Sequence, residues 1–412
     1  MKKNERFQLI IIAGGILITM LPVTMLVPVL KEIVEIRFQV DSFWTHVFMS
    51  TSLIGAIIFS PLVGVVSDRI SERRWLILGA LIGNGLCFIG MIVAPSFQLM
   101  MLARFLEGVF HITALSGWMA GGAELAPDRR SGRIMGALGG MIMFGITIGV
   151  PLGGVIARGL AMNVLWFAAF ISFVAGLIAI GLRIPRHTHS ERTPVKLQES
   201  LLLLKSNPWL GIPYVYTFID RLCVGVIVTS FTLYLADVFQ MSPSQRGFTL
   251  TFFLLPFSFL TYPVGRWVDR YGKIVPLAGG SLLFGLLFMS YGYWSESQLL
   301  WVMILSGVLS AAMFTPTLAM CKDLASPLQY GTVFVGYNVA GSLGFIVGPL
   351  LGGSLLTIYK NHFSSLEAYQ FTFISAGILE VACALFSLPF LLNFRKRRKQ
   401  IISVITLSEE ES

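Results

Sequence analysis

Three titratable or charged side chains, Arg104, Glu107 and His111, stand within one long apolar segment of the sequence. Separations of three and seven residues put them on one face of a helix. A charge inside a bilayer costs several kcal/mol unless it is paired or hydrated, so embedded charges are functional candidates. We hypothesise that Glu107 takes up and releases a proton, that Arg104 stabilises its charged form, and that His111 relays the proton or contacts a substrate. The alternative is an Arg104–Glu107 ion pair that only neutralises itself.

A second group of embedded charges lies in the other half of the chain. Asp220 and Arg221 share one apolar segment, and Glu380 falls near the middle of the last segment. Adjacent residues of a helix point in different directions, so Asp220 and Arg221 each need a partner on another helix. Asp220 is therefore the second candidate for proton coupling, and an interhelical clamp is the alternative.

The elements that hold these side chains are expected to lie in lipid. Of the 412 residues, 55% are hydrophobic and 12% are charged, about half of the roughly 25% charged residues of soluble proteins. This composition excludes a disordered, collagen-like or coiled-coil chain and predicts an all-α membrane protein. The net charge of +9 comes from short clusters between apolar segments, so no nucleic-acid partner is expected. No metal site, cofactor or disulfide is expected from the four isolated cysteines, Cys87, Cys223, Cys321 and Cys383.

Runs of about 20 apolar residues predict membrane-spanning helices. Twelve such runs occur, at 8–30, 42–66, 75–94, 97–123, 134–157, 164–183, 210–236, 247–268, 276–294, 298–321, 331–357 and 368–392. The first run is longer than the core of a signal peptide, so it is expected to remain as a span.

The distribution of Lys and Arg predicts the orientation of the chain. One set of alternate connections, together with both ends of the chain, holds 23 of these cations, whereas the other set holds five. Cytoplasmic connections carry the excess, so both termini are expected in the cytoplasm of a plasma membrane, the inner membrane in a bacterium. The two remaining cations, Arg104 and Arg221, lie within spans.

The longest hydrophilic stretch divides the chain into two six-helix halves. We expect an N-terminal half at 1–183, a cytoplasmic linker at 184–207, a C-terminal half at 208–394 and a cytoplasmic tail at 395–412. Residues 195–205 of the linker are expected to form a short amphipathic helix on the inner membrane surface.

Matches between the halves recur at a separation near 200 residues. Gly64-x-x-x-Asp68-Arg69 pairs with Gly265-x-x-x-Asp269-Arg270, and Glu124-Leu-Ala pairs with Asp323-Leu-Ala. Two copies of six helices with the same orientation are related by an axis along the membrane normal. The embedded charges are not repeated, since Glu107 corresponds to Ser306 and Asp220 to Met20.

These motifs resemble those of the major facilitator superfamily, in particular its twelve-helix drug/proton antiporter branch. Gly64, Asp68, Arg69 and Arg73 resemble its motif A, with Ser71 in place of the second usual glycine, and Gly265, Asp269 and Arg270 resemble a second copy. Arg104-x-x-Glu107-Gly108 resembles motif B, where Gln is usual at the position of Glu107. The resemblance implies two six-helix halves around a central cavity.

Two glycine-rich stretches resemble motif C of the antiporter branch. One holds Gly145, Gly149, Pro151 and Gly153, and the other holds Gly348, Pro349 and Gly352. Small residues let helix backbones approach closely and proline permits a bend, so we interpret both stretches as packing surfaces.

Asp68 has a position suited to gating. A carboxylate just past the second span can accept hydrogen bonds from the free N–H groups at the start of the eleventh span, and Asp269 can do so toward the fifth. The resemblance to motif A implies the same role, and an ordinary loop cap is the alternative.

Three classes of function fit these features. The first is a proton-coupled exporter of hydrophobic compounds by alternating access. The second is a proton symporter or facilitator that imports a metabolite such as an amino acid or siderophore, and the third is a membrane enzyme with Glu107 and His111 as acid and base. No phosphate-binding loop is present, and Asn is scarce in the spans, where Asn84 and Asn338 are the clear cases. We therefore expect a monomeric secondary transporter of small apolar or amphipathic solutes and protons.

Overall fold

The computed structural model describes residues 3–69, 72–125, 131–183, 197–325 and 329–410, and these residues form helices and no strands. Twelve helical segments are long and apolar enough to cross a bilayer, which confirms the twelve predicted spans. The protein is thus an all-α, multi-pass membrane protein. Its spans are Asn4–Val29, Ser42–Ser60, Arg73–Val93, Phe97–Leu125, Ala137–Ile156, Asn163–Ile180, Pro208–Asp237, Pro243–Val268, Ile274–Tyr293, Glu296–Asp323, Thr332–Lys360 and Ser365–Asn393.

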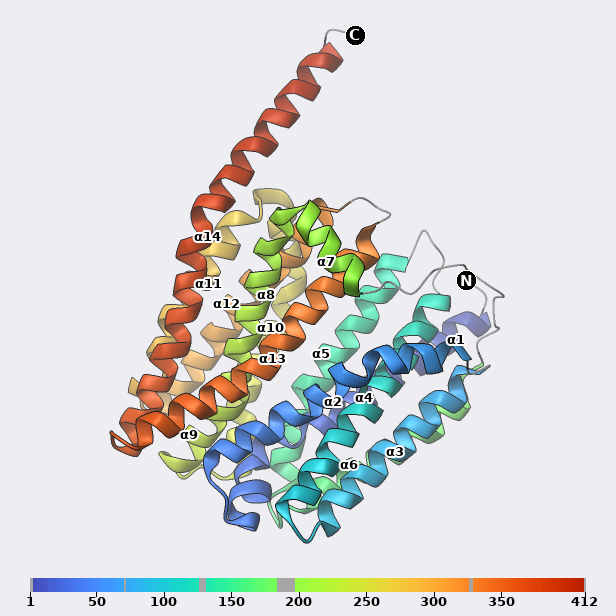
Figure 1. The fold of residues 1–412 in the computed structure, drawn as a ribbon, viewed down its shortest axis with the longest axis vertical. Helices are drawn as coiled ribbons and strands as arrows, with labels where there is room; N and C mark the ends of the chain where they lie inside the picture. The colour runs from blue at the N-terminus through green and yellow to red at the C-terminus, as the bar shows by residue number, and fades with distance from the viewer. Residues whose placement is uncertain (1–2, 70–71, 126–130, 184–196, 326–328, 411–412) are drawn as a thin grey trace.

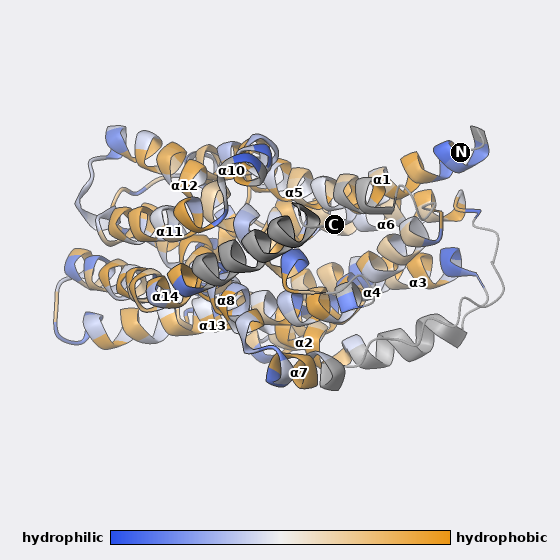
Figure 2. Ribbon diagram, turned by 90° about the horizontal axis from the view of Figure 1, so that it is seen from above, coloured by the Kyte–Doolittle hydropathy of each residue, from blue (hydrophilic) through white to orange (hydrophobic). Residues whose placement is uncertain are grey.

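The helices gather into two groups, one from each half of the sequence (Figures 1 and 2). The first half contains α1 (Lys3–Thr24), α2 (Ser42–Arg69), α3 (Arg73–Val93), α4 (Phe97–Leu125), α5 (Ser131–Ile156) and α6 (Asn163–Ile180). Between α1 and α2 the chain forms a 3₁₀ turn, η1 (Val27–Val29), and a π-helical segment, η2 (Lys31–Ile36).

The second half also contributes six spans, and the first of these is interrupted by a π-helical segment. Its helices are α8 (Gly211–Val226), α9 (Thr232–Asp237), α10 (Pro243–Tyr271), α11 (Ile274–Met289), α12 (Glu296–Asp323), α13 (Tyr330–Lys360) and α14 (Ser365–Glu410), with short 3₁₀ turns at η4 (Pro208–Leu210) and η6 (Tyr291–Tyr293). A π-helical segment, η5 (Ile227–Phe231), joins α8 to α9, so the three form a single span.

Local sequence signals account for several helix boundaries. Ser242 and Gln245 form a capping box at the start of α10, and Ser295 and Gln298 form one at the start of α12. Helix α10 ends at Gly272, whose φ of 100° favours glycine. Helix α14 continues past the predicted end of the last span as far as Glu410.

The linker helix predicted at 195–205 is present as α7 (Leu197–Ser206). It packs against the second half, where the Ser200 hydroxyl donates to the Thr332 carbonyl at 2.7 Å. Leu203 and Leu204 contact a buried cluster around Leu210 and Tyr214.

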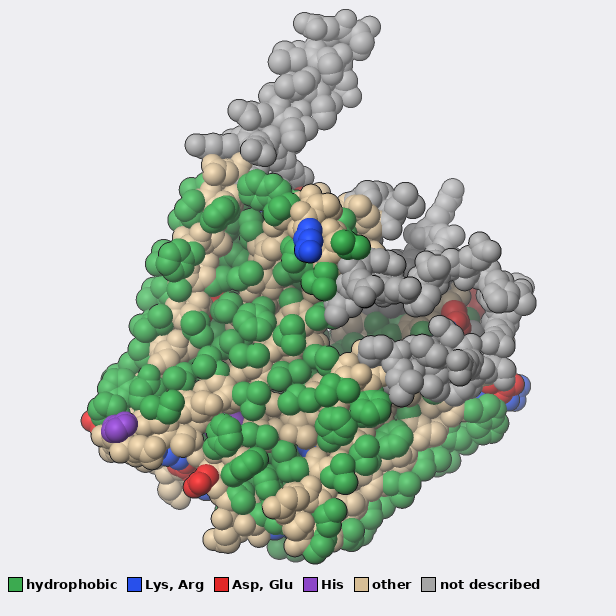
Figure 3. Space-filling view, viewed as in Figure 1, with side chains coloured by type: hydrophobic (Ala, Val, Ile, Leu, Met, Phe, Trp, Pro, Cys, Tyr) green, Lys and Arg blue, Asp and Glu red, His purple; other side chains and the backbone are tan. Residues whose placement is uncertain are grey.

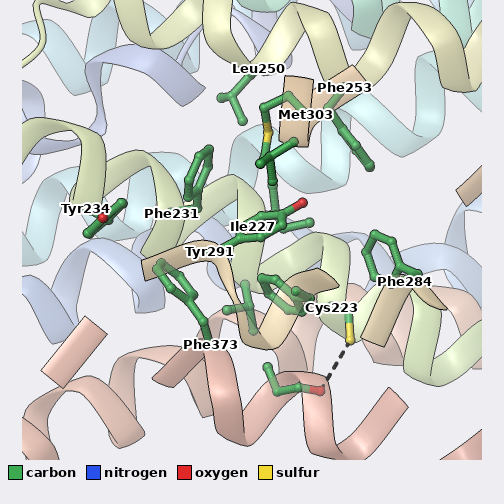
Figure 4. Close-up of a cluster of buried hydrophobic side chains, with 14 of the residues drawn as sticks. Cys223, Ile227, Phe231, Tyr234, Leu250, Phe253, Phe284, Tyr291, Met303 and Phe373 are labelled. Atoms are coloured by element: carbon green, nitrogen blue, oxygen red, sulfur yellow. Dashed lines mark hydrogen bonds between the residues drawn. The ribbon is translucent and has the colours of Figure 1, made fainter. Parts of the chain in front are cut away.

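Each half has its own apolar core, while large hydrophobic side chains also cover the outer surface. In the second half, aromatic residues from several helices meet around Phe231, Tyr291 and Phe373 (Figure 4). On the outside, Trp301 is 73% exposed and Phe386 is 79% exposed, and hydrophobic side chains dominate the face seen in Figure 3. Such a surface is stable in lipid and not in water.

The two halves touch mainly along α2 with α13 and α5 with α10. In the described part of the chain, the hydrogen bonds that join them lie midway along the helices or toward the end away from the chain termini. At the opposite end, near the termini, the surface is hollowed between the halves (Figure 3). We call these the closed end and the open end.

Candidate functional site

The first group of predicted residues forms a buried ion pair within α4. Arg104 Nη1 donates to Glu107 Oε2 at 2.9 Å, and the two side chains are 1% and 0% exposed. The Arg104 guanidinium also lies 5.0 Å from the centre of the Phe48 ring. One turn further on, His111 makes no hydrogen bond to either residue, and its buried Nδ1 has no hydrogen-bond partner among the described residues. The structure therefore joins Arg104 to Glu107 and leaves His111 apart.

Neutral donors complete the surroundings of Glu107. Ser52 of α2 donates to Oε2 at 2.8 Å, and Asn84 of α3 donates to Oε1 at 3.2 Å. Ser172 of α6 in turn donates to the Asn84 amide oxygen at 2.9 Å. The carboxylate thus lies among α2, α3, α4 and α6, inside the first half, with both oxygens satisfied. A fully hydrogen-bonded, cation-paired carboxylate is stabilised in its ionised form.

The sequence did not identify Ser52 or Ser172, because serine is common in apolar helices. A weak signal was present in Gly108, the residue after Glu107. A Cβ there would lie 1.8 Å from the Ser52 carbonyl oxygen, so only glycine permits this approach of α2 and α4. The close approach brings the Ser52 hydroxyl within reach of Glu107.

The second group of predicted residues lies inside the second half. Asp220 and Glu380 line one small pocket, together with Tyr216, Thr217, Met313, Phe314 and Thr317. The pocket lies between α8, α12 and α14. It is too tight for an organic solute in this conformation. The structure thus brings Asp220 and Glu380 to one place, although they are 160 residues apart in sequence.

Among the residues that the structure describes, Glu380 has no cationic partner. It is fully buried, and Ser281 of α11 donates to its Oε1, while the Cys223 thiol of α8 lies 3.6 Å from its Oε2. In Figure 4 the Cys223 thiol points toward α14, where it also contacts the Ala376 carbonyl at 3.7 Å. Neither Ser281 nor Cys223 was identified from the sequence, because partners on separate helices leave no spacing signal.

Arg221 supplies the positive charge nearest to Asp220. Its Nε lies 3.9 Å from Asp220 Oδ2, beyond hydrogen-bond distance, as expected for adjacent helix positions. The guanidinium instead stacks on two rings, 4.8 Å from the centre of Phe314 and 5.2 Å from that of Phe345. Asp220 Oδ1 is buried and accepts no hydrogen bond from any residue that the structure describes.

At the open end, the two copies of motif A carry equivalent ion pairs. Arg73 Nε donates to Glu124 Oε1 at 2.9 Å in the first half. In the second half, Lys273 Nζ lies 2.6 Å from Asp323 Oδ2. These positions correspond at separations of 200 and 199 residues, so the sequence repeat becomes a repeated contact. Arg270 is exposed, and a Cβ at Gly265 would lie 3.4 Å from Thr315 Cγ2.

The gating contacts predicted for motif A stay predictions. The side chains of Asp68, Arg69 and Asp269 lie outside the residues whose side chains the structure describes, as does Gly64.

The motif C glycines lie where helix backbones meet. A Cβ at Gly153 would lie 2.0 Å from the Met25 carbonyl oxygen, and one at Gly149 would lie 2.0 Å from Thr24 Oγ1. In the second half, a Cβ at Gly348 would lie 2.3 Å from the Leu222 carbonyl oxygen. The equivalent helix pairs, α5 with the end of α1 and α13 with α8, are thus packed in the same way. The other members of the two stretches are Gly145, Pro151, Pro349 and Gly352.

The closed end holds a set of charges from both halves, of which the three cations, Lys31, Arg246 and Lys360, lie in predicted connections. Lys31 pairs with Asp237 and Glu32 pairs with Arg246, each across the two halves. Lys360 Nζ lies 3.7 Å from Asp237 Oδ2, and Tyr369 donates to the same carboxylate at 2.5 Å. We call Lys31, Glu32, Asp237, Arg246 and Lys360 the closed-end cluster.

Glu35 lies beside the closed-end cluster. It accepts from Thr45 at 2.8 Å. Burial raises the pKa of Glu35 to about 7, with a further contribution from the nearby Asp237 charge, while Thr45, Lys360 and Lys31 act in the opposite direction.

Comparison with known proteins agrees with this architecture. The family model described as Major Facilitator Superfamily matches residues 12–219 and 213–405. The quinolone resistance protein NorA of Staphylococcus aureus is 24% identical over 317 residues, which cover 74% of this chain and 78% of NorA. The staphyloferrin B transporter of the same species is 30% identical over 190 residues, which cover 45% of this chain and 44% of that protein.

A solved structure shares the fold at low sequence identity. The inward-facing, unoccupied form of a bacterial homolog of the human lysosomal transporter Spinster superposes with a TM-score of 0.81 at 14% identity, over 96% of this chain and 98% of that one. The family and these relatives are transporters, which excludes the membrane-enzyme alternative. Two six-helix halves, repeated loop motifs and a family match that spans nearly the whole sequence lead to one conclusion: the chain belongs to the Major Facilitator Superfamily.

Proposed function

We propose that this transporter exports hydrophobic or amphipathic organic compounds in exchange for protons. NorA, a resistance protein that matches three quarters of this chain, supports export of such compounds. The predicted cytoplasmic position of the termini makes the open end the side from which a substrate enters. Alternating access then requires the closed end to open and the open end to close.

The observation that carries the proton part of the proposal is the state of Asp220. This carboxyl is buried, one oxygen accepts no hydrogen bond, and the nearest cation is 3.9 Å away. A carboxyl so poorly compensated has a small energy difference between its neutral and ionised forms, as a proton carrier needs. Glu107 is more completely compensated, and it stays a second candidate carrier.

Proton flux in inside-out vesicles tests this function. The vesicle interior is acidified, and lipophilic cations, fluoroquinolones, siderophores, sugars and amino acids are added outside in turn. An exported substrate should release protons from the interior, whereas a symported solute would give the opposite response. Absence of proton release for every compound would overturn the proposal.

Single substitutions in the same assay identify the carboxyl that carries the coupled proton. Asp220→Asn should abolish substrate-induced proton release while substrate-for-substrate exchange continues. Glu296→Gln, an exposed change at the start of α12, serves as the matched control and should behave as the wild type. Glu107→Gln with full proton coupling would exclude Glu107 as the carrier.

A second function is favoured by the staphyloferrin B transporter, which has the higher identity over a shorter region. Transport of a polar siderophore or a related metabolite would fit that similarity. In the vesicle assay this function is recognised by a response to siderophores and none to lipophilic cations.

A further inference from the structure

We propose that Glu380 holds the resting proton of this transporter and passes it to Asp220, so that the two carboxyls act as one shared proton site. This inference rests on the proposed proton coupling and extends it to a residue of the last span. It is carried by the burial of Glu380, its two neutral partners and the pocket that it shares with Asp220.

The surroundings of Glu380 require it to be neutral in this conformation. Ionising a fully buried carboxyl costs several kcal/mol unless a cation or several strong donors compensate. In the described part of the chain, the donors to Glu380 are one hydroxyl, from Ser281, and one thiol, from Cys223. A thiol is a weak donor, and the Cys223 thiol is also directed at the Ala376 carbonyl. Glu107, with Arg104, Ser52 and Asn84 around it, shows the compensation that a buried carboxylate charge can receive in the same protein.

The small size of the pocket determines that Asp220 and Glu380 bind a proton and not an organic cation. Both carboxyls line it, and the unpartnered Oδ1 belongs to Asp220. The space is too narrow for an organic cation, whereas a proton needs none. Arg221 stands next to Asp220 and favours the charge there, so the proton resides on Glu380 and the negative charge on Asp220.

Proton transfer from Glu380 to Asp220 conserves both protons and charge. The O–H bond of Glu380 breaks and an O–H bond forms on Asp220, while the negative charge moves to Glu380. Ser281 and Cys223 then donate hydrogen bonds to the transient Glu380 carboxylate. Asp220 then releases its proton toward the open end, and a proton entering from the closed end reprotonates Glu380, which restores the resting state.

The repeat supports a function for Glu380 outside the shared scaffold. The first half has Ile180 and Gly181 at the positions 200 and 199 residues earlier. A residue needed only for packing of six helices would not have to differ in this way between the two copies. The acidic pair is a feature of the second half alone.

Infrared spectroscopy of the purified transporter in lipid tests the inference directly. At neutral pH the wild type should show the carbonyl stretch of a buried neutral carboxylic acid, and Glu380→Gln should remove it. Asp220→Asn should keep the band at neutral pH, because Glu380 then has no acceptor, and should lose it at a lower pH than the wild type, because the negative charge of Asp220 no longer opposes ionisation of Glu380. The same spectrum in Glu367→Gln, an exposed change on the same helix, controls for altered protein content. A wild-type band that persists in Glu380→Gln would overturn the inference.

Transport and stability measurements separate this inference from the proposed function. Glu380→Gln mimics the neutral form, so its thermal unfolding midpoint should equal or exceed that of the wild type. Its proton-driven transport should fall by about tenfold or more while substrate exchange persists, and Glu380→Asp should recover part of the loss. Full coupling in Glu380→Gln contradicts the shared site and leaves the proposed function intact. A wild type without proton coupling contradicts the proposed function, and the infrared band still decides the state of Glu380.

Discussion

At the scale of single residues, the two fully buried glutamates in the described part of the chain differ in the groups around them. Glu107 has a guanidinium and two neutral donors, which can compensate a negative charge. Glu380 has a hydroxyl and a thiol, which suit a neutral acid. The same residue type, equally buried, therefore lies in two different electrostatic environments, and the difference comes largely from partners on other helices.

A third carboxyl, Glu35, predicts a pH dependence of stability. Its pKa is raised from 4.5 to about 7 in the folded protein. Between these values the folded state binds more protons than the unfolded state, so stability falls as the pH rises from 4.5 to 7 and levels off above. The full loss is about 3 kcal/mol.

Glu35→Gln should remove this loss, because an amide does not ionise. The unfolding midpoints of variant and wild type, measured across this range, should therefore diverge as the pH rises, with the variant the more stable above neutrality. Parallel curves would show that Glu35 does not titrate there. Glu296→Gln, which changes an exposed carboxyl, is the control.

At the scale of elements, the repeated helix pairs depend on glycines where backbones cross. Helix α5 approaches the end of α1 at Gly149 and Gly153, and α13 approaches α8 at Gly348. Each half also contains a π-helical segment after its first helix, η2 between α1 and α2 and η5 between α8 and α9. Such segments interrupt the regular hydrogen-bond ladder, and they often occur at functional sites.

Gly153→Ala should destabilise the protein because its Cβ would lie 2.0 Å from the Met25 carbonyl oxygen. A backbone carbonyl cannot move aside as a flexible side chain can, so α1 and α5 must separate. We expect the free energy of unfolding to fall by about 1–3 kcal/mol. Gly140→Ala in the same helix meets nothing within 4 Å and should be neutral or slightly stabilising. Thermal unfolding in detergent measures both, and equal midpoints for the two variants would refute the packing argument.

At the scale of the whole molecule, the conformation is determined by where the halves touch. The closed-end cluster joins them through Lys31–Asp237 and Glu32–Arg246, and beneath it His46 and Ser230 hydrogen-bond at 2.9 Å. At the open end, the described ion pairs of motif A, Arg73–Glu124 and Lys273–Asp323, each stay within one half. Ion pairs between the halves thus stabilise the closed end, whereas the ion pairs at the open end stabilise each half separately.

Asp237→Asn should shift the population toward the state that is open at the closed end. The variant loses the charge that Lys31 and Lys360 face, and a differential effect of about 1–3 kcal/mol would change the population ratio about 5- to 150-fold. Spin labels on each half at the closed end would report a longer distance in electron–electron resonance. Asp41→Asn, at an exposed residue near the same end, is the control. An unchanged distance distribution in Asp237→Asn would mean that the cluster does not hold this end closed.

The sequence by itself determined the twelve spans, the repeat, the family and the identity of the embedded charges. Hydrophobic length and the placement of Lys and Arg are local properties, so they can be read along one chain. The tertiary structure alone decided that Arg104 and Glu107 are enclosed with Ser52 and Asn84, that Asp220 and Glu380 share a pocket, and that loop charges join the halves. These arrangements depend on which helices lie side by side, because the ionisation of a buried carboxyl is set by its neighbours in space and not in sequence.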